Sequence, residues 1–152
     1  MFKMFVLLIA LAAAPIALAE NSVSVDAGDF AAQRAKIEKD LADGKTYAEL
    51  SSAERSDVRA SLDRMASMLE GGKTPDELSA DRKVELYNVQ ERTNMLLTQG
   101  AADSRLVCTR EARTGSRREI TTCMTVAERN RRRTADQDTM QKAQRITLPV
   151  RN

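Results

Sequence analysis

Large side chains are scarce in this chain, and their scarcity limits the available folds more than any other feature. Beyond residue 19 the aromatic residues are only Phe30, Tyr47 and Tyr87, and the chain has no tryptophan. Most other apolar positions hold Ala, Leu, Val or Met. A thin core of this kind suits helices, because each helix needs to bury only one apolar stripe. We therefore predict a mainly α fold, built around a small antiparallel helical bundle.

The first 19 residues have the pattern of a secretory signal peptide. Lys3 is their only charged residue, an apolar run extends from Met4 to Ala14, and Ala17-Leu18-Ala19 provides an A-x-A cleavage site. The apolar run is shorter than the roughly 20 residues that span a bilayer. We predict cleavage after Ala19, a periplasmic or secreted product and no transmembrane segment in the mature chain, with an uncleaved anchor as the alternative.

Charge divides the rest of the chain into two unlike parts. Residues 20–104 contain 11 Lys and Arg against 17 Asp and Glu, a net charge of −6, and residues 105–152 contain 12 against 5, a net charge of +7. Such asymmetry favours an interaction surface or self-complementarity. We divide the mature chain into an acidic helical region (20–104), a β-hairpin (105–124) and a basic helix with a loose tail (125–152).

Two helices are predicted in the first half of the acidic region. The first extends from about Ala27 to Asp43 and is ended by Gly44. The second extends from about Ala53 to Glu70, and Ser51 and Glu54 stand at the spacing of a capping box before it. Its apolar stripe consists of Val58, Leu62, Met65 and Leu69.

A third helix is predicted to begin at Thr74, because Thr74 is followed by Pro75 and then by Glu77 at capping-box spacing. We expect it to continue to about Thr98, with Gly100 as its stop. Its apolar stripe is less regular and is traced by Leu78, Val84, Tyr87 or Asn88, Glu91 and Met95.

Residues 105–124 are rich in β-branched side chains and contain Thr114-Gly115-Ser116-Arg117 at their middle, which predicts a hairpin. Centring the turn on Gly115-Ser116 places three pairs opposite one another: Cys108 and Cys123, Val107 and Met124, Glu111 and Ile120. Directly opposed strand residues lie within disulfide distance. In an oxidising compartment this predicts a structural disulfide. A redox-active pair is the alternative, although the spacing is not Cys-x-x-Cys.

A last helix is predicted from Thr125 to about Arg145, because Thr125 and Glu128 again have capping-box spacing. Apolar residues are few in this segment, so we expect the helix to pack weakly or to project. The tail from Ile146 to Asn152 is predicted to be loose.

Few residues in the chain suit catalysis. Histidine is absent, which removes the commonest general base and the commonest zinc ligand. No glycine-rich phosphate loop is present. The methionines Met65, Met68, Met95 and Met140 resemble soft copper ligands, but core packing is the commoner role of methionine. We predict a non-enzymatic protein without metal or cofactor; the alternatives are a carboxylate-dependent hydrolase of envelope polymers and a chaperone-like protein.

Arginines gather in the basic half and form the candidate binding surface. They are Arg113, Arg117, Arg118, Arg129, Arg131, Arg132 and Arg133. Such a surface suits an acidic protein, an anionic lipid or an envelope polymer. Nucleic acid is disfavoured because this half has no aromatic side chain for base stacking. The alternative is internal pairing, at i,i+4 between Glu128 and Arg132, Arg132 and Asp136, and Asp138 and Lys142, and with the acidic helices.

The segment from Cys108 to Glu128 resembles a group of small exported proteins of Gram-negative bacteria. The shared pattern is a cysteine, a central T-G-S-R turn, a second cysteine, then Thr and an acidic residue, here Cys108, Thr114 to Arg117, Cys123, Thr125 and Glu128. The stretch from Asn88 to Thr98 is similar to the segment that precedes this pattern in closer relatives. Arg129 stands where relatives often have Trp. The resemblance implies an envelope location and a disulfide hairpin, and it implies no reaction.

Overall fold

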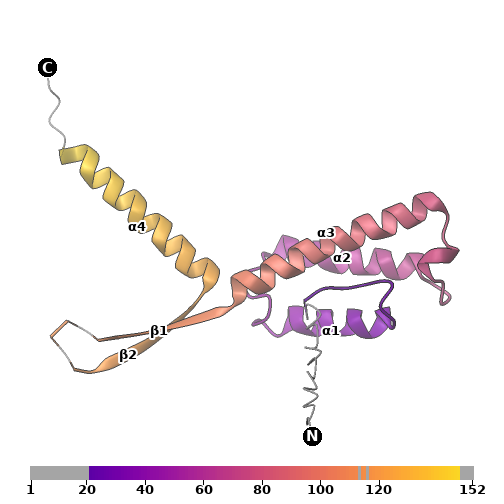
Figure 1. The fold of residues 1–152 in the computed structure, drawn as a ribbon, viewed down its shortest axis with the longest axis horizontal. Coiled ribbons are helices and arrows are strands. Elements are labelled where there is room, and N and C mark those ends of the chain that lie inside the picture. The colour runs from indigo at the N-terminus through magenta and orange to yellow at the C-terminus, as the bar shows by residue number, and fades with distance from the viewer. Residues whose placement is uncertain (1–20, 113, 116, 148–152) are drawn as a thin grey trace, which may run out of the picture.

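A computed structural model describes residues 21–112, 114–115 and 117–147 of the 152-residue chain. Its elements are α1 (Phe30–Ala42), α2 (Ser52–Met68), the 3-10 turn η1 (Pro75–Glu77), α3 (Ala80–Ser104), β1 (Leu106–Ala112), β2 (Glu119–Thr125) and α4 (Val126–Thr147). The first three helices form a bundle, and the hairpin and α4 project from one end of it (Figure 1). The predicted fold class is confirmed.

Some predictions concern residues outside this description. The signal peptide at 1–19 and the tail residues 148–152 are among them. Within the part that the structure describes, no helix is long and apolar enough to cross a membrane.

Helix α2 has the cap and the buried face that its sequence predicts. The Ser51 hydroxyl accepts a hydrogen bond from the Glu54 N–H (3.2 Å), and the Glu54 carboxylate accepts one from the Ser51 N–H (2.8 Å). Val58, Leu62 and Met65 are fully buried and Met68 nearly so. Met65 and Met68 therefore fill the core, as expected of thioether side chains.

The predicted start of the third helix is wrong. Glu77 does accept a hydrogen bond from the Thr74 N–H (2.7 Å). However, this cap is followed by a single 3-10 turn, which ends at Glu77. Leu78 adopts an extended conformation and packs, partly buried, against the core. Helix α3 then begins at Ala80 with Ser79 as its N-cap. Burial of the Leu78 side chain interrupts a helix that local capping alone would allow to continue.

The predicted end of this helix at Gly100 is also wrong, because α3 continues to Ser104 and Gly100 lies buried within it. A Cβ atom at Gly100 would stand 2.7 Å from Cγ of Leu50, in the loop between α1 and α2. Gly100 is thus a point of close approach, where the missing side chain makes room for Leu50.

The predicted apolar stripe of the third helix is wrong at most of its positions, although Leu78 and Tyr87 do pack, partly buried, against the core. Val84 and Met95 are 61% and 64% exposed. The buried face is instead formed by Leu86, Thr93, Leu97, Gly100 and Ser104. The Thr93 hydroxyl donates to the Val89 carbonyl (2.7 Å), and this bond lets a polar residue occupy the core face. The buried face of this helix includes small and hydroxyl residues. A prediction based only on apolar residues therefore selects the solvent-exposed face.

An extended N-terminal segment completes the core, which the sequence did not predict. Val23 and Val25 are buried. Asn94 accepts from the Val23 N–H (2.8 Å) and donates to the Val23 carbonyl (2.9 Å), and Gln33 does the same for Ser24 (2.8 and 3.0 Å). Gln90 accepts from the Val25 N–H (2.7 Å). Side-chain amides of α1 and α3 thus make the backbone hydrogen bonds that a neighbouring strand would otherwise make.

Helix α1 therefore begins later than predicted. It starts at Phe30, and Asp29 caps it by accepting from the Ala32 N–H (3.1 Å). Its buried residues are Ile37 and Leu41, which lie four residues apart on one side of the helix. The residues before Asp29 serve the extended segment and not the helix.

Candidate anion-binding arm

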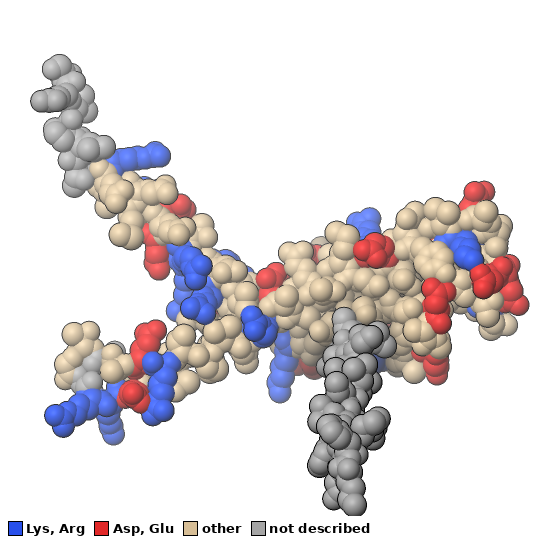
Figure 2. Space-filling view, viewed as in Figure 1, with Lys and Arg blue, Asp and Glu red and all other residues tan. Residues whose placement is uncertain are grey.

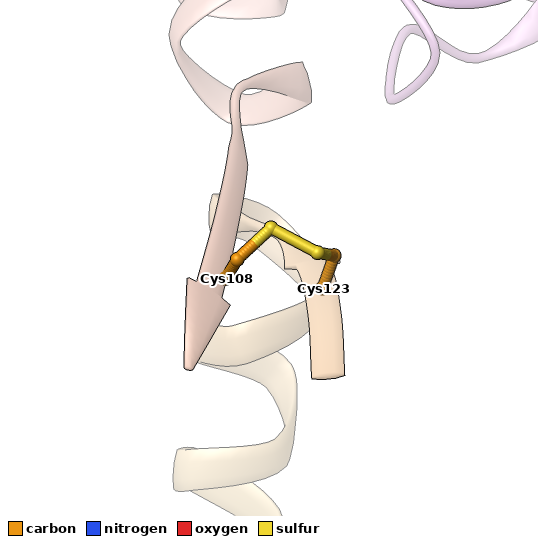
Figure 3. The surroundings of a disulfide bond; sticks show 2 residues. All are labelled: Cys108 and Cys123. Atoms are coloured by element: carbon orange, nitrogen blue, oxygen red, sulfur yellow. A yellow bond between two sulfur atoms is a disulfide. The ribbon is translucent and has the colours of Figure 1, made fainter. Parts of the chain in front are cut away.

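Residues 105–147, the hairpin and α4 together, are here named the arm. The hairpin has the predicted register, with Val107 opposite Met124 and Glu111 opposite Ile120. Cys108 and Cys123 face one another across the strands, with Cα atoms 4.0 Å apart, and form the predicted disulfide (Figure 3). The turn position predicted from the sequence thus gives the observed pairing of β1 with β2.

Residues 114–115 form a turn between the strands, and the described pairing extends to Ala112 opposite Glu119. Gly115 adopts a φ of +80°, a conformation that favours glycine. Arg113 and Ser116 lie outside the described residues.

Strand β2 ends at Thr125 and α4 begins at the next residue, without an intervening loop. The Thr125 hydroxyl accepts from the Glu128 N–H (3.0 Å), which is half of the predicted capping box. The Glu128 carboxylate pairs with Arg132 (2.6 Å). Every residue from Arg129 to Arg145 is exposed, so the expectation that this helix projects is confirmed.

Glu49, in the loop between α1 and α2, joins the arm to the bundle. One carboxylate oxygen accepts from the Thr125 hydroxyl (2.6 Å) and the other from the Arg131 guanidinium (2.8 Å). Beside these bonds the Val126 N–H donates to the Arg105 carbonyl (3.0 Å). The hydrogen bond from Arg131, and then that from Thr125, hold the pKa of Glu49 below its usual value.

The loop that carries Glu49 is itself fixed by the bundle. The Glu49 N–H donates to the Ser104 hydroxyl (2.9 Å), and Arg55 donates to the carbonyls of Tyr47 and Ala48 (both 3.1 Å). Tyr47 is buried, and burial raises its pKa to about 12. Sequence reasoning missed Glu49, because its partner Thr125 is 76 residues away and nothing local distinguishes it.

Some of the predicted arginines form ion pairs within the molecule. Arg131 pairs with Glu49 and Arg132 with Glu128. On the hairpin, Arg110 pairs with Glu119 (2.5 Å). The other predicted i,i+4 pairs, of Arg132 with Asp136 and of Asp138 with Lys142, are not among the ion pairs of the described residues.

The remaining arginines are on the surface. Arg117, Arg118, Arg129 and Arg133 are all exposed. For Arg117, Arg129 and Arg133 the described residues provide no ion-pair partner. From the acidic bundle, Glu49 pairs with an arginine of the arm, Arg131.

These arginines form two separate groups. Arg117 and Arg118 lie at the end of the hairpin, and we call them the tip patch. Arg129 and Arg133 lie on the first turns of α4, and we call them the helix patch. The hairpin and α4 diverge (Figure 1), and basic side chains are visible on both branches (Figure 2). The predicted surface is therefore two patches on one support and not one continuous site.

The pKa shifts resolved for the described carboxylates all have the same direction. Those with a resolved pKa shift, Asp43, Glu49, Glu54 and Asp76, all have a lowered pKa, because each accepts a side-chain hydrogen bond. A cleft lined by Glu49, Glu54 and Asp103 has a volume of only about 40 Å³, whereas ligand pockets usually hold about 300 Å³ or more. The described residues include no group of three or more Cys, Asp or Glu placed to hold a metal ion.

No protein-family model, curated protein or solved structure matches this chain. The resemblance to small exported proteins of Gram-negative bacteria therefore stays a prediction.

Proposed function

We propose that this protein is a non-enzymatic binding or accessory protein of the bacterial cell envelope that presents its arginine-bearing arm to an anionic partner. One observation carries the proposal: the basic arm projects from an acidic bundle, and Arg117, Arg129 and Arg133 have no ion-pair partner among the described residues. Opposite charges in one chain would attract each other if the arm were merely solvated surface free to fold back. Their separation leaves Arg117, Arg129 and Arg133 available to another molecule.

The disulfide-closed hairpin that carries the tip patch favours binding. An isolated two-stranded hairpin is marginal in water, and the Cys108–Cys123 bond closes it covalently. Holding a binding element in one conformation lowers the entropy lost when a partner binds. Arginine suits carboxylate and phosphate groups because its planar guanidinium donates two parallel hydrogen bonds.

The export part of the proposal is supported by the chain's sequence and its disulfide. The first 19 residues have the signal-peptide pattern, and disulfides persist in oxidising compartments. Envelopes of Gram-negative bacteria contain anionic lipids, acidic proteins and anionic polymers, and each offers carboxylate or phosphate groups. The absence of aromatic residues from residues 105–152 weighs against single-stranded nucleic acid.

The two alternatives receive less support. A chaperone-like role needs exposed apolar stripes, whereas the stripe of α2 is buried and the exposed Val84 and Met95 of α3 are separated by the polar Asn88 and Glu91. A carboxylate-dependent hydrolase needs a raised carboxylate pKa in a cleft, and the resolved shifts are downward.

The proposal is tested by reversing the charge of the tip patch. Protein with Arg117→Glu and Arg118→Glu is used beside wild type to capture material from solubilised envelopes. A matched control carries Arg59→Glu and Arg82→Glu, which change the net charge equally at exposed positions of the bundle. We expect the tip variant to lose the captured species and the control to retain it. A capture profile identical for all three proteins would contradict the proposal.

A further inference from the structure

Helix α3 has a patterned outer face opposite its buried one. Val84, Asn88, Glu91 and Met95 recur at spacings of four, three and four residues, so they share one side of the helix. Val84 and Met95 are among the most exposed large apolar residues of the bundle, at 61% and 64%. Glu91 is exposed and has no ion-pair partner among the described residues. Two apolar side chains thus flank an unpaired carboxylate on an open surface.

Helix α4 has one face with the complementary chemistry. Arg129, Arg133 and Met140 are spaced by four and seven residues and therefore share a side of the helix. Met140 is 64% exposed, and both arginines are exposed without an ion-pair partner in the part of the chain that the structure describes. Elsewhere α4 is polar on all sides, and such a helix usually bridges or meets another surface.

The two faces match when the helices are placed antiparallel. Met140 follows Arg133 by seven residues, and Val84 precedes Glu91 by seven. Seven residues make about two helical turns, so both pairs fall on the same line of contact. Setting Arg133 against Glu91 therefore sets Met140 against Val84. The same alignment places Arg129 against Met95, where the aliphatic part of the arginine covers the thioether.

The same chain cannot make this match. The hydrogen bond from the Val126 N–H to the Arg105 carbonyl fixes the start of α4 beside the end of α3. Folding α4 back in that register would place Arg133 near Thr98 and Met140 against Glu91, two turns out of alignment. In addition, Glu49 holds Arg131, and α4 points away from α3 (Figure 1).

We infer that the Arg129–Arg133–Met140 face of α4 binds the outer face of α3 in a second copy of this chain, antiparallel. The inference rests on the proposed function, because it takes the arm as the binding part of the molecule. It assigns α4 its own partner and leaves the tip patch to the envelope. The net charges of residues 20–104 and 105–152, −6 and +7, are also complementary, which favours contact between the bundle of one copy and the arm of the other.

The test is a charge exchange in the purified protein, followed by sedimentation velocity at about 50 mM salt, where screening is weak. Wild type should show a mass that rises with concentration to twofold or more. Arg133→Glu and Glu91→Arg should each weaken self-association roughly tenfold, since each sets like charges opposite one another. The double variant R133E/E91R restores an opposite pair and should recover association. Arg59→Glu, at an exposed position of α2, is the control.

Two results would overturn the inference. One is a wild type that stays monomeric over the whole concentration range at low salt. The other is a double variant that remains as weak as the single variants, because it would show that Arg133 and Glu91 do not meet. A monomeric wild type whose tip patch still captures envelope material would end this inference and leave the proposed function standing. Self-association without tip-dependent capture would do the reverse.

Discussion

The bundle and the arm are stabilised in different ways, although they belong to one chain. In the bundle most large apolar residues are buried, Val84 and Met95 excepted, and even the extended N-terminal segment has its backbone bonded by amide side chains. In the arm almost every side chain is exposed, and its conformation depends on a disulfide, a strand ladder and a few ion pairs. A region without a core of its own has its surface available for contact with other molecules.

The sharpest difference concerns the cost of removing a large side chain. Leu62→Ala in the bundle should lower the free energy of unfolding by about 2–5 kcal/mol, because it leaves a cavity in a packed core. Met140→Ala on α4 should change it by less than about 0.5 kcal/mol. Urea titration followed by circular dichroism measures both. A comparable loss for Met140→Ala would mean that α4 is packed against another surface, in the same molecule or in a second copy.

The second comparison removes the disulfide. Replacing Cys108 and Cys123 with Ser should cost the hairpin about 3 kcal/mol of local stability, in proportion to the loop that the bond closes. Amide hydrogens of β1 and β2 should then exchange far faster, while those of α2 and α3 keep their protection. Hydrogen exchange with mass spectrometry resolves the two regions. Equal loss of protection in both would show that bundle and arm unfold as one unit.

The third comparison concerns the extended N-terminal segment, which is held to the bundle by hydrogen bonds with side-chain amides. Asn94→Ala removes both hydrogen bonds to Val23 and should destabilise the protein by about 1–3 kcal/mol, because a partly buried N–H and carbonyl lose their partner. The matched control is Asn88→Ala, at an exposed position of the same helix. Thermal unfolding measures the difference, and equal midpoints for the two variants would contradict the assigned role of Asn94.

The smallest effect is expected at the joint between the two regions. Because the folded-state pKa of Glu49 is lowered, its contribution is fully present above its unfolded value of 4.5 and is lost as the pH falls through the folded value. The energy is under about 1 kcal/mol, since Arg131 is largely exposed.

This loss should appear as a broader distribution of distances between spin labels on Ser67 and Thr139 at acid pH. Glu49→Gln should give the broad distribution already at neutral pH. A variant distribution as narrow as that of wild type would show that Glu49 does not hold the arm.

Local rules predicted the elements whose stability is local. The Ser51–Glu54 box, the stripe of α2 and the register of the hairpin follow from short-range spacing, and the structure has them. The same rules failed where a distant contact decides. Thr74 begins only a 3-10 turn because Leu78 packs on the core, and Gly100 stays within α3 because it admits Leu50.

The candidate site shows the same limit. The exposure of Arg117, Arg129 and Arg133 fits the prediction from charge, but the sequence did not indicate that the arginines form two groups. Glu49 was missed for a similar reason, since only the folded chain brings it to Thr125. The spacing of Val84, Glu91 and Met95 predicts a core-facing stripe, whereas in the structure these residues lie on the solvent side of α3.

The backbone passes from the bundle to the arm only once, at Arg105 between α3 and β1, whereas β2 continues into α4 without a break. Rotation about this single crossing turns the hairpin and α4 together. A molecule that immobilises the hairpin loop therefore also sets the heading of α4, some distance away. The direction in which one branch is tethered thus decides which neighbours the other can reach.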